Sequence, residues 1–179
     1  MKTGLDRINT YLLAAAAAVA AFAWLSGAGC STAQKEKLEE ASLRLHMQAN
    51  PDRSAQGNTT NAIIGRVTPF EVTIERLPFL TEFNIERADV ADSVAGFSIA
   101  VQFTPEGTIT LEQYTTAYKG QKMVIGAEFG QTRWLAAPVI RQRIADGKLV
   151  FTPDATREEA ERIVRGLNRV AYLVKNGRK

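Results

Sequence analysis

Apolar and polar residues alternate along several short segments of the chain, and this alternation predicts β-strands. In residues 42–48, Leu43, Leu45 and Met47 alternate with polar residues, so the face that carries His46 is expected to be exposed to solvent. Further strands are predicted over residues 69–77, 86–92, 96–104, 121–129, 132–140 and 148–152. Alternating aromatic residues in these strands are expected in the core, namely Phe70, Phe97 and Phe103.

The spacing of apolar residues changes to that of a helix in two segments. Residues 108–120 contain a capping box at Thr110–Gln113, which predicts the start of a first helix. A second capping box at Thr156–Glu159 predicts a helix over residues 156–168. Residues 169–174 allow two interpretations, a closing strand or a continuation of the helix, and we favour the strand.

Two connecting segments complete the predicted fold. Residues 50–61 are rich in Pro, Gly, Asn and Ser, which predicts a loop, and residues 80–85 suit a short helical turn capped by Thr81. The Asp-Gly pair at residues 146–147 predicts the turn before the last strand. Two helices packed on a mostly antiparallel sheet give a two-layer α+β domain, expected over residues 42–179.

The N-terminal segment has the pattern of an export signal. Residues 12–25 form an uncharged, alanine-rich run behind Lys2 and Arg7, and small residues at 26–29 precede Cys30. The run is shorter than the ~20 residues that a membrane-spanning helix needs, but it suits the apolar part of a signal peptide.

This segment resembles the signal of bacterial lipoproteins, although Gly27 stands where that family usually has leucine. The resemblance implies a signal peptide over residues 1–29, lipid on Cys30 and a solvated tether over residues 30–41. Ser31 favours the outer membrane by analogy with enterobacterial sorting. The alternatives are an ordinary signal cut near Ala28, an uncleaved anchor with an idle thiol, and a brief helix in place of the tether.

Composition argues against several classes of chemistry. The net charge of +3 is a small surplus without a basic stripe in the sequence, so no nucleic-acid partner is expected. A single cysteine and a single histidine, Cys30 and His46, make a thiolate metal cluster or a catalytic triad improbable. Glu158 and Glu159 are adjacent on a helix and do not converge on a substrate. We expect no catalytic residue, no cofactor, no metal and no small-molecule substrate.

Several segments after residue 77 match one known family in order and spacing. They are Pro78–Thr81, Phe103–Gly107, Ala136–Val139, Gly147 and Glu158–Ala160. With these segments the chain resembles, over about residues 70–168, the head subdomain of the first periplasmic domain of SecD, an auxiliary subunit of the Sec protein-export machinery. Phe129–Thr132 replaces the family's Asp-Gly hairpin turn, and we find no counterpart of its proton-coupled transmembrane helices. The resemblance therefore implies a fold and a binding surface.

Together these patterns favour a lipid-anchored, non-catalytic protein of the bacterial envelope that faces the periplasm. Its partners would be the membrane, through Cys30, and exported polypeptides or an envelope protein complex. A partner polypeptide would be held by pairing with an exposed sheet edge. The alternative is a scaffold lipoprotein that reuses the fold with no role in export. An enzyme is the third hypothesis, and it requires a polar cleft around His46.

Overall fold

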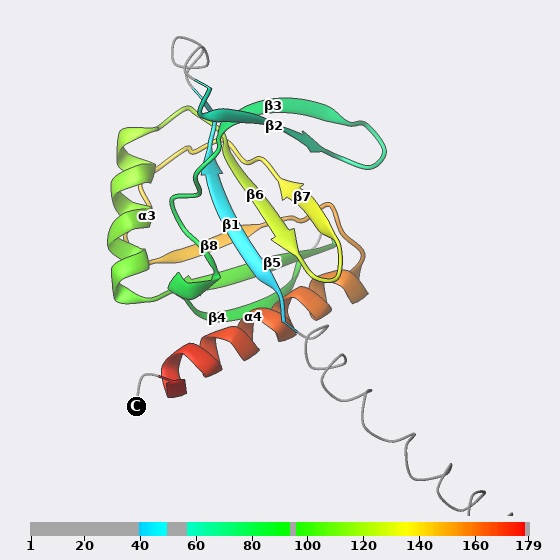
Figure 1. Cartoon of the computed structure of the whole chain (residues 1–179), viewed down its shortest axis with the longest axis vertical. Coiled ribbons are helices and arrows are strands. Elements are labelled where there is room, and N and C mark those ends of the chain that lie inside the picture. The colour runs from blue at the N-terminus through cyan, green and yellow to red at the C-terminus, as the bar shows by residue number, and fades with distance from the viewer. Residues whose placement is uncertain (1–39, 50–56, 94–95, 178–179) are drawn as a thin grey trace, which may run out of the picture. The chain divides into compact units, whose positions relative to one another are not determined.

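The computed structural model describes residues 40–49, 57–93 and 96–177. Its strands are β1 (Ser42–Met47), β2 (Thr59–Ile64), β3 (Phe70–Glu75), β4 (Ile85–Ser93), β5 (Gly96–Phe103), β6 (Met123–Glu128), β7 (Thr132–Ala136) and β8 (Lys148–Phe151) (Figure 1). Its helices are the short 3-10 helix η2 (Glu82–Asn84), α3 (Pro105–Ala117) and α4 (Arg157–Gly177). The predicted signal at residues 1–29, Cys30 and all but the last two residues of the tether predicted over residues 30–41 lie outside the described residues.

The strands form three antiparallel sheets, with the orders β1-β6-β7, β2-β3 and β4-β5-β8. The larger core cluster takes residues from both three-stranded sheets and from both long helices, including Leu43, Phe103, Leu111 and Ile163. The predicted α+β class, with antiparallel strands and two helices, is confirmed. Among the described residues, no helix has the length and the apolar run needed to cross a membrane.

The β2–β3 hairpin covers the second face of β1, and this corrects the prediction for His46. A smaller core cluster joins Ile64 and Ile74 of the hairpin to Val124 of β6, which is the partner of His46 in the antiparallel register. His46 is only 6% exposed as a result. The alternation in β1 shows which residues share a face, but it does not show that a hairpin encoded after the strand will cover the polar one.

The hairpin also corrects the predictions for its own residues. The predicted loop at residues 50–61 is wrong at its end, because β2 begins at Thr59 and pairs Thr59 with Glu75. Phe70 is not a core residue, since 44% of it is exposed and its ring faces the Lys122 ammonium. Pairing within the hairpin places Thr59 in a strand and leaves Phe70 exposed. The composition of the two segments does not reveal this pairing.

Both helices differ from their predicted bounds, because α3 covers Pro105–Ala117 instead of residues 108–120 and α4 ends later than predicted. Helix α3 begins at Pro105 with Thr104 as its N-cap, so Thr110 lies inside the helix and donates its hydroxyl to the Glu106 carbonyl. Proline is favoured in the first helical turn, and this preference outweighs the apparent capping box at Thr110. The capping box at Thr156–Glu159 is confirmed by reciprocal hydrogen bonds.

Helix α4 continues to Gly177, so the strand favoured for residues 169–174 is wrong. The helix buries Gly166 next to Ile163 and Leu167, and its apolar face continues beyond them with half-buried Val170 and Val174. A glycine inside a helix costs about 1 kcal/mol relative to alanine, which packing of a neighbouring face can offset. The predicted short turn is confirmed as η2, with Thr81 as its N-cap.

Candidate functional site

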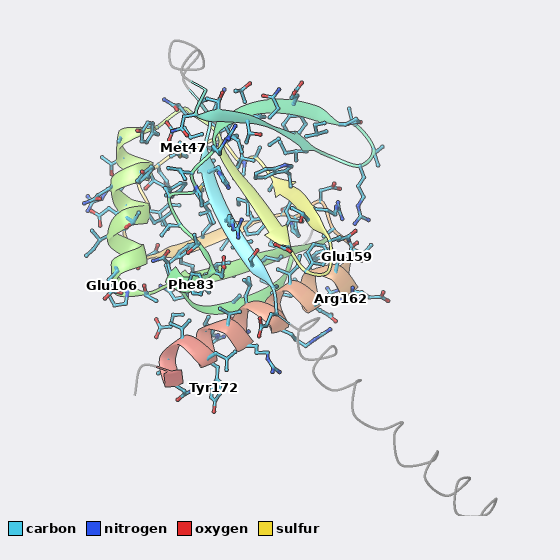
Figure 2. The ribbon with its side chains drawn as sticks, viewed as in Figure 1. Met47, Phe83, Glu106, Glu159, Arg162 and Tyr172 are labelled. Atoms are coloured by element: carbon cyan, nitrogen blue, oxygen red, sulfur yellow. The ribbon has the colours of Figure 1, made fainter. Side chains whose placement is uncertain are left out.

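A groove of about 650 Å³ lies between the C-terminal half of α4, the 3-10 helix η2 and the first turn of α3. Phe83 of η2 and Tyr172 of α4 line it and are 59% and 67% exposed. In Figure 2, Phe83 and Glu106 lie on the side of the molecule that faces the half of α4 carrying Tyr172. Because exposed apolar surface gathered at one place often marks an interaction site, this groove is the candidate binding site.

The wall formed by η2 and α3 depends on close backbone packing. The backbone N–H of Thr104 donates to the Asn84 carbonyl at 2.8 Å, and the Thr104 hydroxyl accepts from the Gly107 N–H at 3.2 Å. A Cβ atom on Gly107 would lie 2.9 Å from the Asn84 carbonyl oxygen. Glycine at 107 therefore allows the first turn of α3 to lie directly against η2.

The opposite wall is held by a side-chain amide. Asn168 of α4 accepts from the Ala88 N–H and donates to the Ala88 carbonyl, both at 2.8 Å. These two bonds fix the helix to β4, next to the irregular register between Ile85 and Arg87. Because both walls are tied by hydrogen bonds to the sheet or to each other, the groove is formed before any partner binds.

Charged groups in the groove are few and of both signs. Glu86, Glu106 and Lys175 are among the lining residues, and they accompany the apolar side chains of Phe83 and Tyr172. Within the described ranges, no group of three or more His, Cys, Asp or Glu side chains could hold a metal ion. The groove therefore suits non-covalent contact with an apolar segment that has polar flanks.

The groove was not expected from the sequence, because the strand favoured for residues 169–174 would not place Tyr172 beside η2. With the helical period continued, Asn168, Ala171, Tyr172 and Lys175 fall at the spacing i, i+3, i+4 and i+7, on one side of the helix. That spacing was the available signal. Nothing comparable marks Phe83, because a single helical turn is too short to show a period.

His46, on which the enzyme hypothesis depends, lies away from the groove and contacts Glu75 and Trp134. Its Nδ1–H donates to the Glu75 carbonyl at 2.9 Å, and its ring meets Trp134 edge to face at 5.3 Å. Burial lowers its pKa below the ordinary 6.5, and the nearby charge of Arg44 acts in the same direction, while the bond to Glu75 opposes them. His46 is not among the residues that line the groove.

The lowered pKa predicts how stability responds to acid. The unfolded chain takes up a proton on His46 near pH 6.5, whereas the folded chain does so only at lower pH. The stability conferred by neutral His46 is therefore complete above pH 6.5 and is lost as the pH falls toward the folded-state pKa. We expect urea unfolding between neutral pH and about pH 5 to show a flatter pH dependence for His46→Gln than for the parent chain.

His46 is the only histidine of the chain, so its ring protons can be assigned directly in an NMR titration. The titration is expected to give a midpoint below 6.5. A midpoint at or above that value would show that the hairpin leaves the imidazole accessible to water.

The glutamate pair considered in the sequence separates into two environments. Glu158 is exposed, whereas Glu159 accepts hydrogen bonds from Arg66 at the hairpin and from Arg133 of β7. Partial burial raises the pKa of Glu159, but hydrogen bonds from Arg66 and the Thr156 N–H outweigh it and leave the pKa below its usual value. Glu159 thus joins α4 to the hairpin and acts as a structural residue.

The sheet edges proposed as binding sites are partly closed. The Leu45 N–H and carbonyl of β1 pair with Leu80 and Phe79, both at 2.9 Å. The Ala88 N–H and carbonyl of β4 are occupied by Asn168. At β1 and β4, addition of a further strand would have to displace these bonds, so the groove is the better-supported binding surface.

Comparison with known proteins identifies the fold. No protein-family model and no curated protein sequence matches the chain. A solved structure of SecDF, a membrane component that enhances protein export, aligns with a TM-score of 0.54 at 23% identity and covers 79% of this chain and 70% of that one. A second, of SecDF in its super-membrane-facing form, aligns with a TM-score of 0.51 at 23% identity.

The second match covers 78% of this chain but spans only 21% of that SecDF chain. At these identities the likeness concerns the fold. The resemblance to SecD expected from the sequence is confirmed at that level.

Proposed function

We propose that the chain is a lipid-anchored, non-catalytic protein of the bacterial envelope, and that the groove beside α4 binds a polypeptide or a protein partner on the periplasmic side. The observation that carries the proposal is the pair of exposed aromatic residues, Phe83 and Tyr172, on a groove whose walls are held by hydrogen bonds. Aromatic side chains supply large contact areas at low entropic cost and dominate many interfaces.

The expected location rests on two separate features. The apolar run at residues 12–25, followed by small residues and Cys30, has the pattern of a lipoprotein signal. The fold is similar to part of SecDF, which is itself a membrane component. Lipid on Cys30 would keep a domain of this fold at the membrane surface without a membrane-spanning helix.

A binding role fits the chemistry of the groove better than catalysis. Its two carboxylates, Glu86 and Glu106, line it together with Lys175 and two exposed aromatic residues. No histidine or cysteine is among its lining residues, so it lacks the nucleophile-and-base pair on which most hydrolytic sites depend. An apolar stretch of an extended or helical polypeptide can place its side chains between Phe83 and Tyr172.

The test is site-specific photocrosslinking of the full chain in its own cells. A photoreactive residue at Phe83 or Tyr172 is expected to give protein adducts, whereas the same residue at Ile63, which is 63% exposed on the hairpin, should give few. Adducts that increase when export substrates accumulate support a role in export. A single constant partner supports the scaffold alternative.

The anchor is tested in the same cells with Cys30→Ser. This variant is expected to lose lipid labelling and to leave the membrane fraction, and its crosslinks at Phe83 should decline with it. Only self-adducts at both groove positions would contradict the binding proposal. An unlabelled parent that stays in the membrane would contradict the lipid anchor and leave the groove untouched.

A further inference from the structure

Helix α4 carries a line of cationic and apolar side chains that neither the core nor the groove uses. Arg162, Arg165 and Leu173 are exposed. The helical period places Arg165 opposite the buried Ile163, and it places Arg162 and Leu173 on the flank between the two faces. Half-buried Arg169 lies in the same line, and Tyr172 lies at the border between this line and the groove. We name Arg162, Arg165 and Leu173 the outer stripe of α4.

The charge around the outer stripe is positive. From Arg162 to Gly177 the helix contains four cationic residues and no Asp or Glu, namely Arg162, Arg165, Arg169 and Lys175. Two carboxylates precede the stripe on the helix. Glu158 is exposed one turn before Arg162, and Glu161 lies 4.0 Å from Arg165 and 3.9 Å from Arg157. The neighbouring strand β4 also carries carboxylates, namely Glu86, Asp89 and Asp92.

Two of those β4 carboxylates already have cationic partners. Asp89 pairs with Arg87 at 2.7 Å, and Asp92 pairs with Arg157. A third, Glu86, lines the groove rather than the outer stripe. The stripe therefore keeps a positive surplus, and its leucine and bordering tyrosine give it the composition of a helix that lies on a membrane surface.

The beginning of the domain lies close to this helix. Strand β1 begins at Ser42 and contacts α4, and Figure 1 shows its first residues beside the helix. Residues 31–41 separate Cys30 from the strand, and even a fully extended chain of that length reaches only roughly 40 Å. An anchor at Cys30 would hold α4 within that distance of the lipid.

From the positive charge of the stripe and the short reach between Cys30 and α4, we propose that the outer stripe of α4 binds the surface of an anionic phospholipid membrane. The proposal rests on the lipid anchor of the proposed function, and it adds an orientation to it. With the stripe on the lipid, the groove lies on the adjacent side of α4, at the edge of the contact, and receives its partner along the membrane surface.

The experiment uses the full chain purified from bacterial membranes and reconstituted into two kinds of vesicle. One contains phosphatidylcholine alone, and the other contains phosphatidylcholine mixed with phosphatidylglycerol. Phenylglyoxal modifies accessible guanidinium groups, and mass spectrometry gives the rate at each site. We expect modification of Arg162 and Arg165 to be several-fold slower on the anionic vesicles, while exposed Arg141 reacts at the same rate on both.

A pair of charge reversals isolates the stripe. In the variant Arg162→Glu/Arg165→Glu, Arg169 serves as the reporter, and its modification should be no slower on anionic than on neutral vesicles. In the parent, added salt should reduce the difference between the two vesicles. The matched variant Arg141→Glu/Lys148→Glu changes the net charge equally at exposed positions elsewhere and should keep the difference. Thermal unfolding of both variants checks that the fold is intact.

Flotation separates failure of the anchor from failure of the stripe. An anchored chain floats with both kinds of vesicle, and equal modification of Arg162 and Arg165 on the two would then overturn the membrane contact. A chain that floats only with anionic vesicles lacks the anchor but supports the stripe. Modification of Arg162 and Arg165 that is slower on anionic vesicles but does not respond to added salt would overturn the electrostatic contact.

Discussion

Trp134→Ala is expected to lower the free energy of unfolding by about 2–3 kcal/mol, because Trp134 is partly buried and a fully buried tryptophan would cost about 3–5 kcal/mol. Trp134 packs on the smaller core cluster between the β2–β3 hairpin and β6, and its ring lies over Gly126. A Cβ atom on Gly126 would lie 2.8 Å from that ring, so glycine provides the space for it. Loss of the indole removes one of the apolar side chains that pack against the hairpin.

Differential scanning calorimetry and urea unfolding would measure the loss, which corresponds to a melting point lower by on the order of 10 °C. Phe70→Ala is the control, because Phe70 belongs to the same hairpin but is 44% exposed, and it should cost about 1 kcal/mol. The pKa of His46 should also rise toward 6.5 in Trp134→Ala, since the indole contributes to its burial. Equal costs for the two variants would show that Trp134 does not hold the hairpin.

The success of sequence analysis depended on how local the determining interactions are. The turn at Thr81 and the capping box at Thr156–Glu159 were predicted correctly, because a cap needs only residues three positions apart. The strand pair β4–β5 was also predicted, since its alternation and connection lie within about twenty residues. These elements are sufficient to establish the α+β class.

The errors arose where distant segments decide the environment. His46 lies in a strand with clear alternation, yet a hairpin encoded later covers its polar face. Residues 169–174 are equally compatible with a strand by composition, and the contact of Asn168 with Ala88, eighty positions earlier, helps to keep them helical. The groove could not be found without that helix, because Tyr172 lines it only when the helical period continues.

The resemblance to SecD and the groove provide different information about function. The resemblance concerns a fold, and a fold can serve several functions. The groove is a property of this chain's own side chains, and its aromatic residues were not among the segments that matched the family. A binding role therefore depends on Phe83 and Tyr172, and the experiments on these residues are independent of the resemblance.

Gly147→Ala is expected to cost about 3 kcal/mol through two separable effects. Gly147 has φ of +67°, a conformation that costs an L-residue roughly 1–2 kcal/mol. A Cβ atom there would also overlap the Thr108 hydroxyl and lie 3.0 Å from Thr108 Cβ and Cγ2, and such overpacking costs about 1–3 kcal/mol. The Asp-Gly turn was evident from the sequence, but its contact with α3 was not.

Two further variants separate the backbone effect from the steric one. Gly120→Ala tests the backbone alone, because Gly120 has φ of +90° and a Cβ atom there would meet nothing within 4 Å. In the background of Thr108→Ala, the cost of Gly147→Ala should fall by about 1–2 kcal/mol, since most of the clash has gone. Urea unfolding of the four chains of this cycle gives the coupling energy. Additive costs at the two positions would mean that α3 shifts freely away from the turn, and that Gly147 is required for its conformation alone.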